Sequence, residues 1–431
     1  MKHIAIIGAG PGGMSAAHDL LNAGFHVTLF EREAAVGGLA GGFRDPRWST
    51  TLENFYHHWF ESDHAMLGLI EELGWKEDIR FYRPKTVVYY NQRFYPLDTP
   101  LAALLFPGFS LLDKVRFGLV TGWLRYFAKW QPLERTSAHE WMRRAYGEHL
   151  YKTQFEPLLI GKFSNHYREV NMAWFWARFK ARSTRLGTFQ GGFQVFLERF
   201  AKSLSERGAE FRFQASITSI TPLPDGRITL GTQAGNKTFD AVLATTSPRL
   251  LADLTPALDD AYRSKLVGLK SIGAVNLILT LNHPLSTQGY YWFNLPKTAG
   301  FPFLALVEHT NLLPAELFGG DHIIYCGDYL PADHEYFKLS KEELLERFIP
   351  SFKRINPDFS PSWVRQTWLF RSAYAQPVPG LNHSQNIPPI QTSVKNLFFA
   401  SMSQVYPWDR GTNYAVELAR QAATQIISSV R

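Results

Sequence analysis

The chain has 431 residues, enough for two or three domains with substantial cores, and a formal net charge of +7. Its basic residues are dispersed and match no nucleic-acid-binding motif, so they favour an acidic small molecule or an anionic membrane surface over DNA or RNA. A single cysteine, Cys326, excludes an internal disulfide and favours a reducing, cytoplasmic compartment. No secretory signal is predicted before the first strand, and no run of 18 apolar residues that would span a bilayer is present.

The first forty residues carry a dinucleotide-binding fingerprint. Residues 4–7 form an apolar run that predicts a buried strand, and a helix is predicted over 11–23. Between them lies G-x-G-x-x-G, in which the first glycine makes the turn, the second lets the backbone approach a pyrophosphate, and the third lets the helix pack closely on the sheet. The pyrophosphate then binds at the helix N-terminus. The residues predicted to hold it are Gly8, Gly10, Pro11, Gly12 and Gly13.

The continuation favours FAD over NAD. A second strand, 26–30, ends at Glu31, whose carboxylate stands about 20 residues after the glycines and is placed to accept the ribose hydroxyls of an adenosine. A second glycine pair follows, where the backbone can again approach a phosphate. The predicted cofactor residues of this stretch are Glu31, Arg32, Gly37, Gly38, Leu39 and Ala40.

Later segments return to the same pattern. The pair Gly191-Gly192 opens a helix with apolar residues at helical spacing, and a strand over 210–214 leads to Ile217. Residues 225–226 predict a hairpin turn, 239–248 a buried strand, 394–400 another strand, and 408–417 the beginning of the last helix.

The segments between these FAD-type blocks predict a hairpin, a run of helices and further strands. A hairpin is predicted over 85–98 with its turn at Asn91-Gln92, followed by a mostly helical region over 100–188. Strands are then predicted at 274–281, 304–308 and 322–325, and a helix at 341–352. These patterns indicate a mixed sheet accompanied by a helical block.

Residues 100–129 interleave bulky apolar residues with Lys114, Arg116, Arg125 and Lys129. An amphipathic helix at a membrane surface has this composition. Buried helices whose cations extend to water have it too. Both interpretations remain open.

Several side chains are candidates for chemistry. His57 and His58 are predicted to hydrogen-bond flavin or substrate, or to be ordinary histidines; their spacing matches no zinc template, and no metal is predicted. Arginines 168, 178, 182 and 185 would bind a phosphate or carboxylate if they converged, and otherwise form a solvated face. The 33 Phe, 18 Tyr and 12 Trp suit an apolar cavity as well as a core. The aromatic residues expected to line it are Trp59, Phe155, Phe175 and Trp292.

Residues 8–41 resemble the flavin-containing amine oxidoreductase superfamily, which includes protoporphyrinogen oxidases, phytoene-type desaturases and, more distantly, UDP-galactopyranose mutases. The blocks at 188–220, 239–248 and 411–414 resemble it as well. The resemblance implies that backbone near Ile217 pairs with adenine, and that a helix N-terminus formed by Gly411, Thr412, Asn413 and Tyr414 points at the flavin. The chain departs from the superfamily pattern at three places: Leu39 replaces an arginine, Ser401 and Met402 replace an acid, and Asn276 replaces the lysine of amine oxidases.

The resemblance implies an α/β fold in which an α+β substrate domain is inserted into a Rossmann-type FAD-binding domain. The expected FAD-binding segments are 1–78, 189–262 and 386–431, and the expected substrate-domain segments are 79–188 and 263–385. The implied function is an FAD-dependent oxidoreductase that moves a hydride from an apolar or amphiphilic small molecule to flavin, with oxygen or a quinone as acceptor. The alternatives are a mutase-like isomerase acting on a sugar nucleotide with reduced flavin, and a non-catalytic flavin-binding scaffold. Candidate catalytic residues are His57, His58, Arg168, Asn276 and Tyr414.

Overall fold

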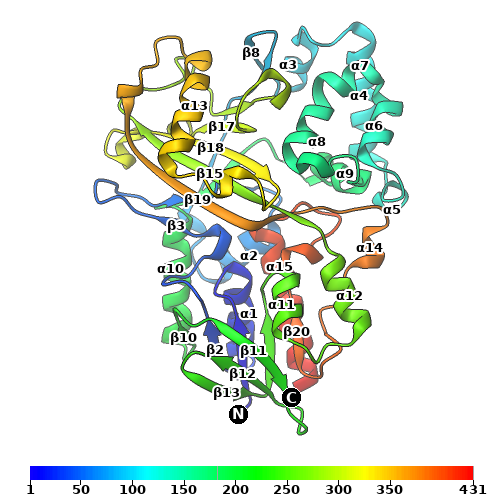
Figure 1. The fold of residues 1–431 in the computed structure, drawn as a ribbon, viewed down its shortest axis with the longest axis vertical. Coiled ribbons are helices and arrows are strands. Elements are labelled where there is room, and N and C mark those ends of the chain that lie inside the picture. Colours follow the sequence, from blue (N-terminus) through cyan, green and yellow to red (C-terminus); the bar gives the residue numbers. More distant parts are fainter. Residues whose placement is uncertain (182, 431) are drawn as a thin grey trace.

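The computed structural model describes residues 1–181 and 183–430, which form two large sheets and a helical block (Figure 1). Both chain ends lie at the bottom of the view in Figure 1, at the end of the first sheet that is remote from the second. No helix of the described residues is long and apolar enough to cross a membrane.

The first sheet is five-stranded and entirely parallel. Its order is β10 (Glu210–Arg212), β2 (His26–Phe30), β1 (His3–Ile7), β14 (Ala241–Ala244) and β20 (Leu397–Phe399). In β1, Ile4 and Ile6 face one side of the sheet, and Ala5 and Ile7 face the other. Because both faces are apolar, both must be covered.

Two different layers cover this sheet. One face packs against α1 (Pro11–Asn22), α2 (His64–Glu72), α10 (Phe193–Glu206) and α15 (Thr412–Val430). The other face packs against a three-stranded antiparallel sheet, β11 (Ile217–Pro222), β12 (Ile228–Thr232) and β13 (Gly235–Phe239), and against α11 (Pro248–Leu254) and α12 (Asp260–Gly268). The result is a Rossmann-type three-layer arrangement.

The second sheet has seven strands. Its order is β19 (Val364–Pro377), β15 (Ser271–Leu281), β18 (His322–Leu330), β17 (Ala305–Glu308), β16 (Trp292–Asn294), β7 (Thr86–Tyr90) and β8 (Arg93–Pro96). Only the β16–β7 pair is parallel among these neighbours, so the sheet is mixed. Helix α13 (Lys341–Ile355) covers one face, and the other packs through Ile278 and Tyr325 on Trp48 and Leu52 of the N-terminal segment.

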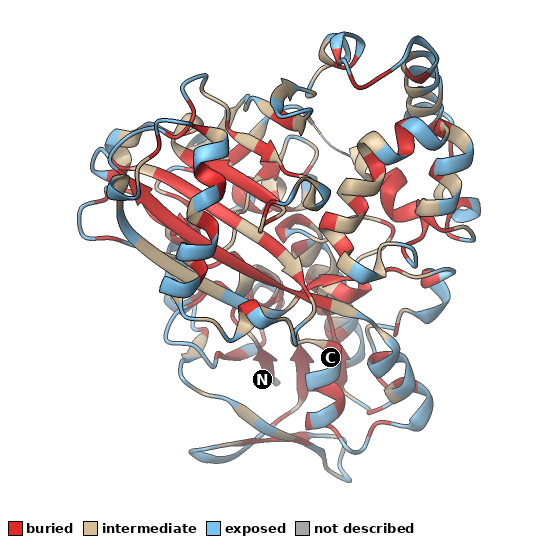
Figure 2. Ribbon diagram, turned by 45° about the horizontal axis from the view of Figure 1, so that its top comes forward, coloured by how far each residue is buried: buried red, intermediate tan, exposed pale blue. Residues whose placement is uncertain are grey.

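The helical block stands beside this sheet, in cyan and green at the upper right of Figure 1. It contains α3 (Pro100–Leu105), α4 (Leu111–Tyr126), α5 (Trp130–Leu133), α6 (Ala138–Tyr146), α7 (Glu148–Leu150), α8 (Glu156–Phe163) and α9 (Met172–Ala181). Shorter elements complete the chain: β3 (Gly42–Phe43), β4 (Leu52–Glu53), β5 (Trp59–Phe60), β6 (Ile79–Tyr82), β9 (Leu186–Phe189) and α14 (His383–Asn386). Figure 2 shows that the central strands of both large sheets are mostly buried, whereas the edge strands β8, β10 and β19 are largely intermediate or exposed.

The predicted fold class is confirmed, with local differences at element ends. The last strand is shorter than expected, 397–399, because residues 392–397 form a hydrogen-bonded turn with Asn396 at a positive φ of 64°. The last helix begins at Thr412 instead of 408. Asp63 precedes α2 as predicted, but its carboxylate accepts a hydrogen bond from the Phe60 N–H instead of capping the helix.

Glu53 joins three of these elements through its side chain and its backbone carbonyl. Glu53 of β4 accepts a hydrogen bond from the N–H of Phe193, the first residue of α10, at 2.9 Å. Its carbonyl oxygen accepts a second from the Tyr325 hydroxyl of β18, also at 2.9 Å. Burial raises the pKa of the Glu53 carboxyl to about 7. The junction between the two large sheets therefore contains a carboxyl group that is favoured in its neutral form.

We expect Glu53→Gln to change the pH dependence of stability. The pKa of Glu53 is higher in the folded chain than in the unfolded one, so its stabilising contribution is complete at low pH and is lost as the pH rises through 7. The variant lacks this loss, and its free energy of unfolding relative to wild type should therefore increase between pH 5 and pH 8, by about 3 kcal/mol at most. Thermal unfolding at both pH values measures the difference.

The control is Glu206→Gln at an exposed position of α10. It should shift the unfolding temperature by the same amount at both pH values. A Glu53→Gln difference that is also independent of pH would contradict the assignment of a neutral, buried carboxyl.

Candidate flavin and substrate site

The first turn of the parallel sheet is built for close backbone approach. Gly8 has a φ of +110°, and a Cβ at either Gly8 or Gly13 would collide, with the Thr245 hydroxyl and with the Gly8 carbonyl oxygen respectively. Gly10 is open towards the site, its nearest neighbour being the Gly37 carbonyl oxygen at 3.8 Å from a built Cβ. No side chain caps α1, so the N–H groups of its first turn remain available to an anion.

The second glycine pair lies against this turn. The Gly37 N–H donates to the Ala9 carbonyl at 3.0 Å, and a Cβ at Gly38 would lie 3.7 Å from the Gly10 Cα. Gln194 of α10 fixes the loop, since its Oε1 accepts from the Gly42 N–H at 2.9 Å and its Nε2 donates to the Val36 carbonyl at 3.3 Å. Leu39 and Ala40 follow in a short 3₁₀ turn over 38–40. Two backbone segments thus face one another without intervening side chains, which fits a pyrophosphate.

Glu31 lies at the carboxyl end of β2, buried beside these turns. One carboxylate oxygen accepts from the Ala9 N–H at 2.9 Å and the other from the Glu33 N–H at 3.0 Å. The Ala215 N–H donates to the Glu31 carbonyl at 2.9 Å, which brings the start of β11 at Ile217 next to Glu31. Arg32 differs from the other predicted residues, since it is exposed and pairs with Glu33 at 3.0 Å. The groups expected around an adenosine are therefore together, apart from the Arg32 side chain.

The N-terminus of α15 is the third part of the site. The Thr412 hydroxyl accepts from the Trp59 indole N–H at 3.0 Å, and the Asn413 Oδ1 accepts from the Met66 N–H at 3.1 Å. These side chains hold the helix end in place. The Gly411 carbonyl directly before the helix accepts from the Ala415 N–H at 3.1 Å, and the first-turn N–H groups give the helix its positive end. Tyr414 stacks on Trp408, with ring centroids 5.8 Å apart and planes at 5°.

The position of the expected acid after the last strand is occupied by Ser401. Its hydroxyl is hydrogen-bonded to the Tyr374 hydroxyl at 2.8 Å, and its N–H donates to the Gln404 Oε1 at 2.7 Å. A neutral network stands where the resemblance predicts a carboxylate.

The predicted histidines lie in the loop between β4 and β5. The Nδ1 of His57 is 2.6 Å from the Phe55 carbonyl oxygen, and since a carbonyl only accepts, this nitrogen carries the proton. Burial lowers the pKa of His57 to about 4, so the imidazole is neutral with its Nε2 lone pair available. His58 packs its ring on Phe60 and Tyr56, with centroids 4.7 Å and 5.1 Å away.

Asn276 of β15 reaches the same loop. Its Nδ2 donates to the Asn54 carbonyl at 2.8 Å, and the side chain is almost fully buried. Within the described residues the Asn54 Oδ1 is buried without a hydrogen-bond partner. The position of the amine-oxidase lysine therefore holds a neutral amide that joins the second sheet to the loop.

A group of ionisable side chains lies beside the α15 N-terminus. We call Lys162, Arg178, Tyr329, Asp409 and Arg410 the buried charged cluster, and each of these residues is half-buried, not fully enclosed. Asp409 Oδ2 accepts from Arg178 Nη1 at 2.8 Å and lies 3.8 Å from Lys162 Nζ. Arg410 Nη2 donates to the Tyr329 hydroxyl at 2.6 Å, and Lys162 Nζ lies 4.5 Å from the centre of the Tyr329 ring.

Burial and neighbouring charges shift the pKa values of this cluster. Burial lowers the pKa of Lys162 to about 8. Burial alone would raise the pKa of Tyr329, but the positive charges of Arg410 and Lys162 bring it down to about 8. Sequence reasoning missed Lys162 and Tyr329, because helix α8 and strand β18 are far apart in the chain and no motif links them.

The three predicted arginines that the structure describes do not converge on one point. Arg178 belongs to the buried charged cluster, but Arg168 is exposed and stacks 5.3 Å from the ring of Tyr167. Arg185 is exposed and pairs with Glu61 at 3.2 Å, and Arg182 lies outside the described residues. Within the described residues, Lys162 lies beside Asp409 together with Arg178, and Arg168 does not.

Three of the four aromatic residues expected to line a cavity are core residues. Trp59 packs on Phe193 between the parallel sheet and its helices, and Phe155 and Phe175 pack within the helical block. Trp292 is half-buried, 5.1 Å from the ring of Tyr56. The expectation was wrong for the first three because sequence composition does not separate core rings from cavity walls.

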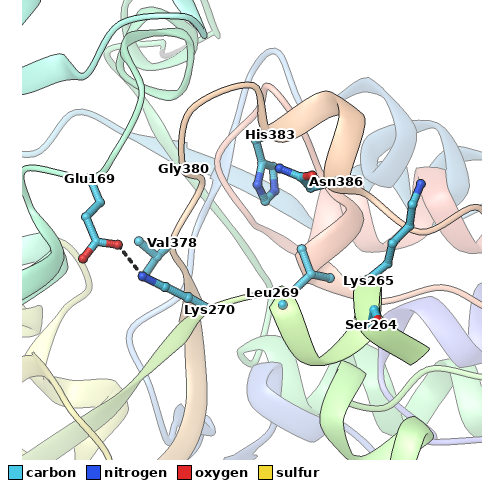
Figure 3. Close-up of a pocket in the computed structure, with 10 residues that line it drawn as sticks. Glu169, Ser264, Lys265, Leu269, Lys270, Val378, Gly380, His383 and Asn386 are labelled. Carbon is cyan, nitrogen blue, oxygen red and sulfur yellow. Dashed lines mark hydrogen bonds and ion pairs between the residues drawn. The ribbon is translucent and has the colours of Figure 1, made fainter. Parts of the chain in front are cut away.

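A groove with a volume of about 480 Å³ lies elsewhere, between the end of α12 and residues 378–386. Figure 3 shows Glu169 and Lys270 joined by an ion pair at one side of it, and His383 and Asn386 at the other. None of its lining residues belongs to the glycine turns or to the buried charged cluster, so we do not assign the flavin to it.

Comparisons with known proteins agree with this geometry. The family model of flavin-containing amine oxidoreductases matches residues 11–427. Zeta-carotene desaturase from Synechocystis sp. is 23% identical over 99% of this chain and 97% of its own.

Solved structures show the same fold. A putative protoporphyrinogen oxidase from Exiguobacterium sp. has a TM-score of 0.77 at 18% identity, covering 99% of each chain. A reduced UDP-galactopyranose mutase has a TM-score of 0.75 at 15% identity, covering 99% of this chain and 96% of that one. The chain belongs to the flavin-containing amine oxidoreductase family and is an FAD-dependent oxidoreductase.

Proposed function

We propose that this enzyme dehydrogenates an apolar or amphiphilic small molecule. In this reaction the substrate loses a hydride to the flavin and a proton to solvent or a protein group, and one of its single bonds becomes a double bond. Oxygen or a quinone then takes the two electrons and regenerates oxidised flavin. The observation that carries the proposal is the end-to-end similarity to zeta-carotene desaturase. Two glycine turns that allow close backbone approach, at residues 8–13 and 37–38, support it.

The residues that would hold FAD follow from the site geometry. The first-turn N–H groups of α1 and the Gly37–Gly38 loop would bind the pyrophosphate, and Glu31 with backbone near Ile217 would bind the adenosine. The α15 N-terminus would stabilise negative charge on reduced flavin. When bound, flavin supplies the two-electron acceptor chemistry, and the protein supplies positioning and electrostatics.

Neutral groups flank the reaction site in this proposal. His57 is uncharged and keeps its Nε2 for a hydrogen bond to flavin or substrate, and Asn276 replaces a lysine by an amide. Neither group suits the recognition of an amine as such, but both are compatible with an apolar reacting carbon. Arg168 has no part in the proposed site, since it is exposed on the helical block.

We also propose the domain boundaries given by the sequence, with FAD-binding segments 1–78, 189–262 and 386–431 and substrate segments 79–188 and 263–385. All five strands of the parallel sheet come from the first set, and all seven strands of the mixed sheet come from the second.

The proposal includes docking on an anionic membrane surface through α3 and α4. Ten of the fifteen large apolar side chains that are exposed among the described residues lie in this short region. They are Leu101, Leu104, Leu105, Leu111, Leu112, Val115, Leu119, Trp123, Tyr126 and Phe127. The basic side chains of Arg116, Arg125 and Lys129 are exposed among them and complement anionic lipid. A lipid-soluble substrate would be reached from such a position.

The cofactor assignment predicts a loss of FAD in Glu31→Ala. The variant loses a charge-assisted acceptor for the ribose and for the Ala9 N–H, so FAD affinity should fall by about 1–3 kcal/mol. FAD released on denaturation is compared with protein concentration after dialysis. Glu33→Ala, at the exposed neighbour, should retain full occupancy, and equal occupancy in both variants would count against the assignment.

The redox proposal predicts anaerobic bleaching of the oxidised flavin by an apolar donor. In stopped-flow spectroscopy, a partly saturated polyene or a porphyrinogen should reduce one flavin per substrate oxidised, and a primary amine should not. Turnover of a nucleotide sugar that requires pre-reduced flavin, leaves it reduced, and collapses in Arg178→Ala would instead establish the mutase. Flavin that no donor reduces and no nucleotide sugar engages would favour the scaffold.

Membrane docking predicts co-flotation with vesicles that contain phosphatidylglycerol. Replacing Leu105 and Leu119 by Glu removes apolar area and adds negative charge, so the bound fraction should fall by about tenfold or more. Leu250→Glu, at an exposed leucine outside the region, is the matched control. Equal flotation of both variants, or none for wild type, would rule out this surface.

A further inference from the structure

The buried charged cluster carries more positive than negative charge. Among its described members, Lys162, Arg178 and Arg410 are cations. Asp409 is the carboxylate beside Lys162 and Arg178, whereas Arg410 donates to the Tyr329 hydroxyl. Tyr329 is mostly a neutral phenol near pH 7, since its pKa is about 8. Removing charges from water is costly unless opposite charges or hydrogen bonds compensate for it, so this excess calls for an anion.

Lys162 shows where that anion would bind. Its ammonium lies 3.8 Å from Asp409 Oδ2, which is too long for a hydrogen bond, and its other close neighbour is the face of the Tyr329 ring. Within the described residues its three N–H groups have no hydrogen-bond acceptor. Arg178 uses one terminal nitrogen for Asp409 and retains further donors.

The cations of the cluster remain accessible to a ligand. The side chains of Lys162 and Arg178 are 16% and 21% exposed, although burial in the protein lowers the pKa of both. The cluster is formed by residues of α8, α9, the end of β18 and the segment before the α15 N-terminus.

The surroundings of these cations are aromatic. Arg178 stacks 5.0 Å from the ring of Trp174, whose indole N–H donates to Asp409 at 3.2 Å. Trp408 lies 5.8 Å from Trp176 on one side and stacks on Tyr414 on the other. A ligand here would meet fixed cations at one end and aromatic faces beside them.

We propose that Lys162, Arg178 and Arg410 form a subsite for the carboxylate or phosphate of an amphiphilic substrate, whose apolar part extends towards the flavin. This inference rests on the proposed function and narrows its substrate class from apolar or amphiphilic molecules to anionic amphiphiles. Recognition would come from the Lys162 ammonium and from the remaining N–H groups of the guanidinium of Arg178, which suits planar oxygen pairs.

The test uses the oxidised FAD holoenzyme and three ligands of equal chain length: decanoate, decyl phosphate and decanol. Binding is followed by the perturbation of the flavin absorbance and by the shift in unfolding temperature, neither of which needs turnover. Wild type should bind at least one of the anions about tenfold or more tightly than decanol. Tighter binding of decanoate would indicate a carboxylate headgroup, and tighter binding of decyl phosphate would indicate a phosphate headgroup.

Lys162→Met is the main variant, because it removes a cation and leaves the Arg178–Asp409 ion pair intact. It should lose the preference for the anion by about tenfold while keeping its affinity for decanol. Lys162→Arg should restore part of the preference. The control Arg168→Met changes an exposed arginine of the same helical block and should behave as wild type.

The outcomes separate this inference from the proposed function. If decanol binds as tightly as both anions, or if Lys162→Met keeps the preference, the subsite is refuted even when an apolar donor reduces the flavin. If Lys162→Met changes only the flavin redox potential, the cations serve reduced flavin and the subsite is likewise refuted. If inorganic phosphate binds in a Lys162-dependent manner but no decyl ligand binds, the anionic amphiphile is refuted as the ligand, and the proposed function is then decided separately by whether an apolar donor reduces the flavin.

Discussion

The close approach of α1 to the end of β1 is the constraint on which the rest of this structure depends. A side chain at Gly8 would meet Thr245 of the segment after β14, and one at Gly13 would meet the Gly8 carbonyl. Only because both are glycines can the helix start immediately above the strand and present its uncapped N–H groups to one point. Gly37, Gly38 and Glu31 are then arranged around that point by backbone hydrogen bonds.

The second constraint is the junction between the two large sheets, which is polar in several places. Asp321 is buried and pairs with Arg47 and Arg365 at 2.8 Å each, so the segment after β3 is tied to the mixed sheet. Two hydrogen bonds provide further links, from the Tyr325 hydroxyl to the Glu53 backbone carbonyl and from the Asn276 amide to the Asn54 carbonyl. Such contacts need specific geometry, whereas apolar packing tolerates small shifts, and they therefore fix how the mixed sheet lies over the dinucleotide turn.

The charged and apolar features of the helical block divide between its inner and outer sides. Its inner side contributes Lys162 and Arg178 to the buried charged cluster beside α15. Its outer side, at α3 and α4, exposes leucines and aromatic rings that a monomer in water does not normally gather in one region. An anionic amphiphile taken from a membrane would pass from the apolar outer side at α3 and α4 to the cations on the inner side. This path would explain why one helical block carries both an exposed apolar surface and the charged cluster.

The sequence alone determined the local parts of this protein. The apolar run before Gly8, the spacing to Glu31, the glycine pairs and the helix breaks act within a few residues of one another, so their structural consequences can be predicted without knowing the rest of the chain. For that reason the elements of the parallel sheet and the FAD cofactor could be recognised. The turn at Asn91-Gln92, where both residues have positive φ, was predictable on the same local grounds.

Only the tertiary structure decided which side chains share a site. Asp409, Lys162 and Tyr329 come from segments separated by about 80 to 250 positions, and the electrostatic interaction between them depends on distance in space, which spacing in the chain does not encode. Arg168 and Arg178 are ten positions apart, yet Arg168 is exposed, whereas Arg178 is half-buried and pairs with Asp409. Composition also does not show which apolar residues are buried. Trp59 and Phe155 fill cores, whereas Leu105 and Leu119 face outward. Packing against partners from distant segments decides which apolar side chains leave water.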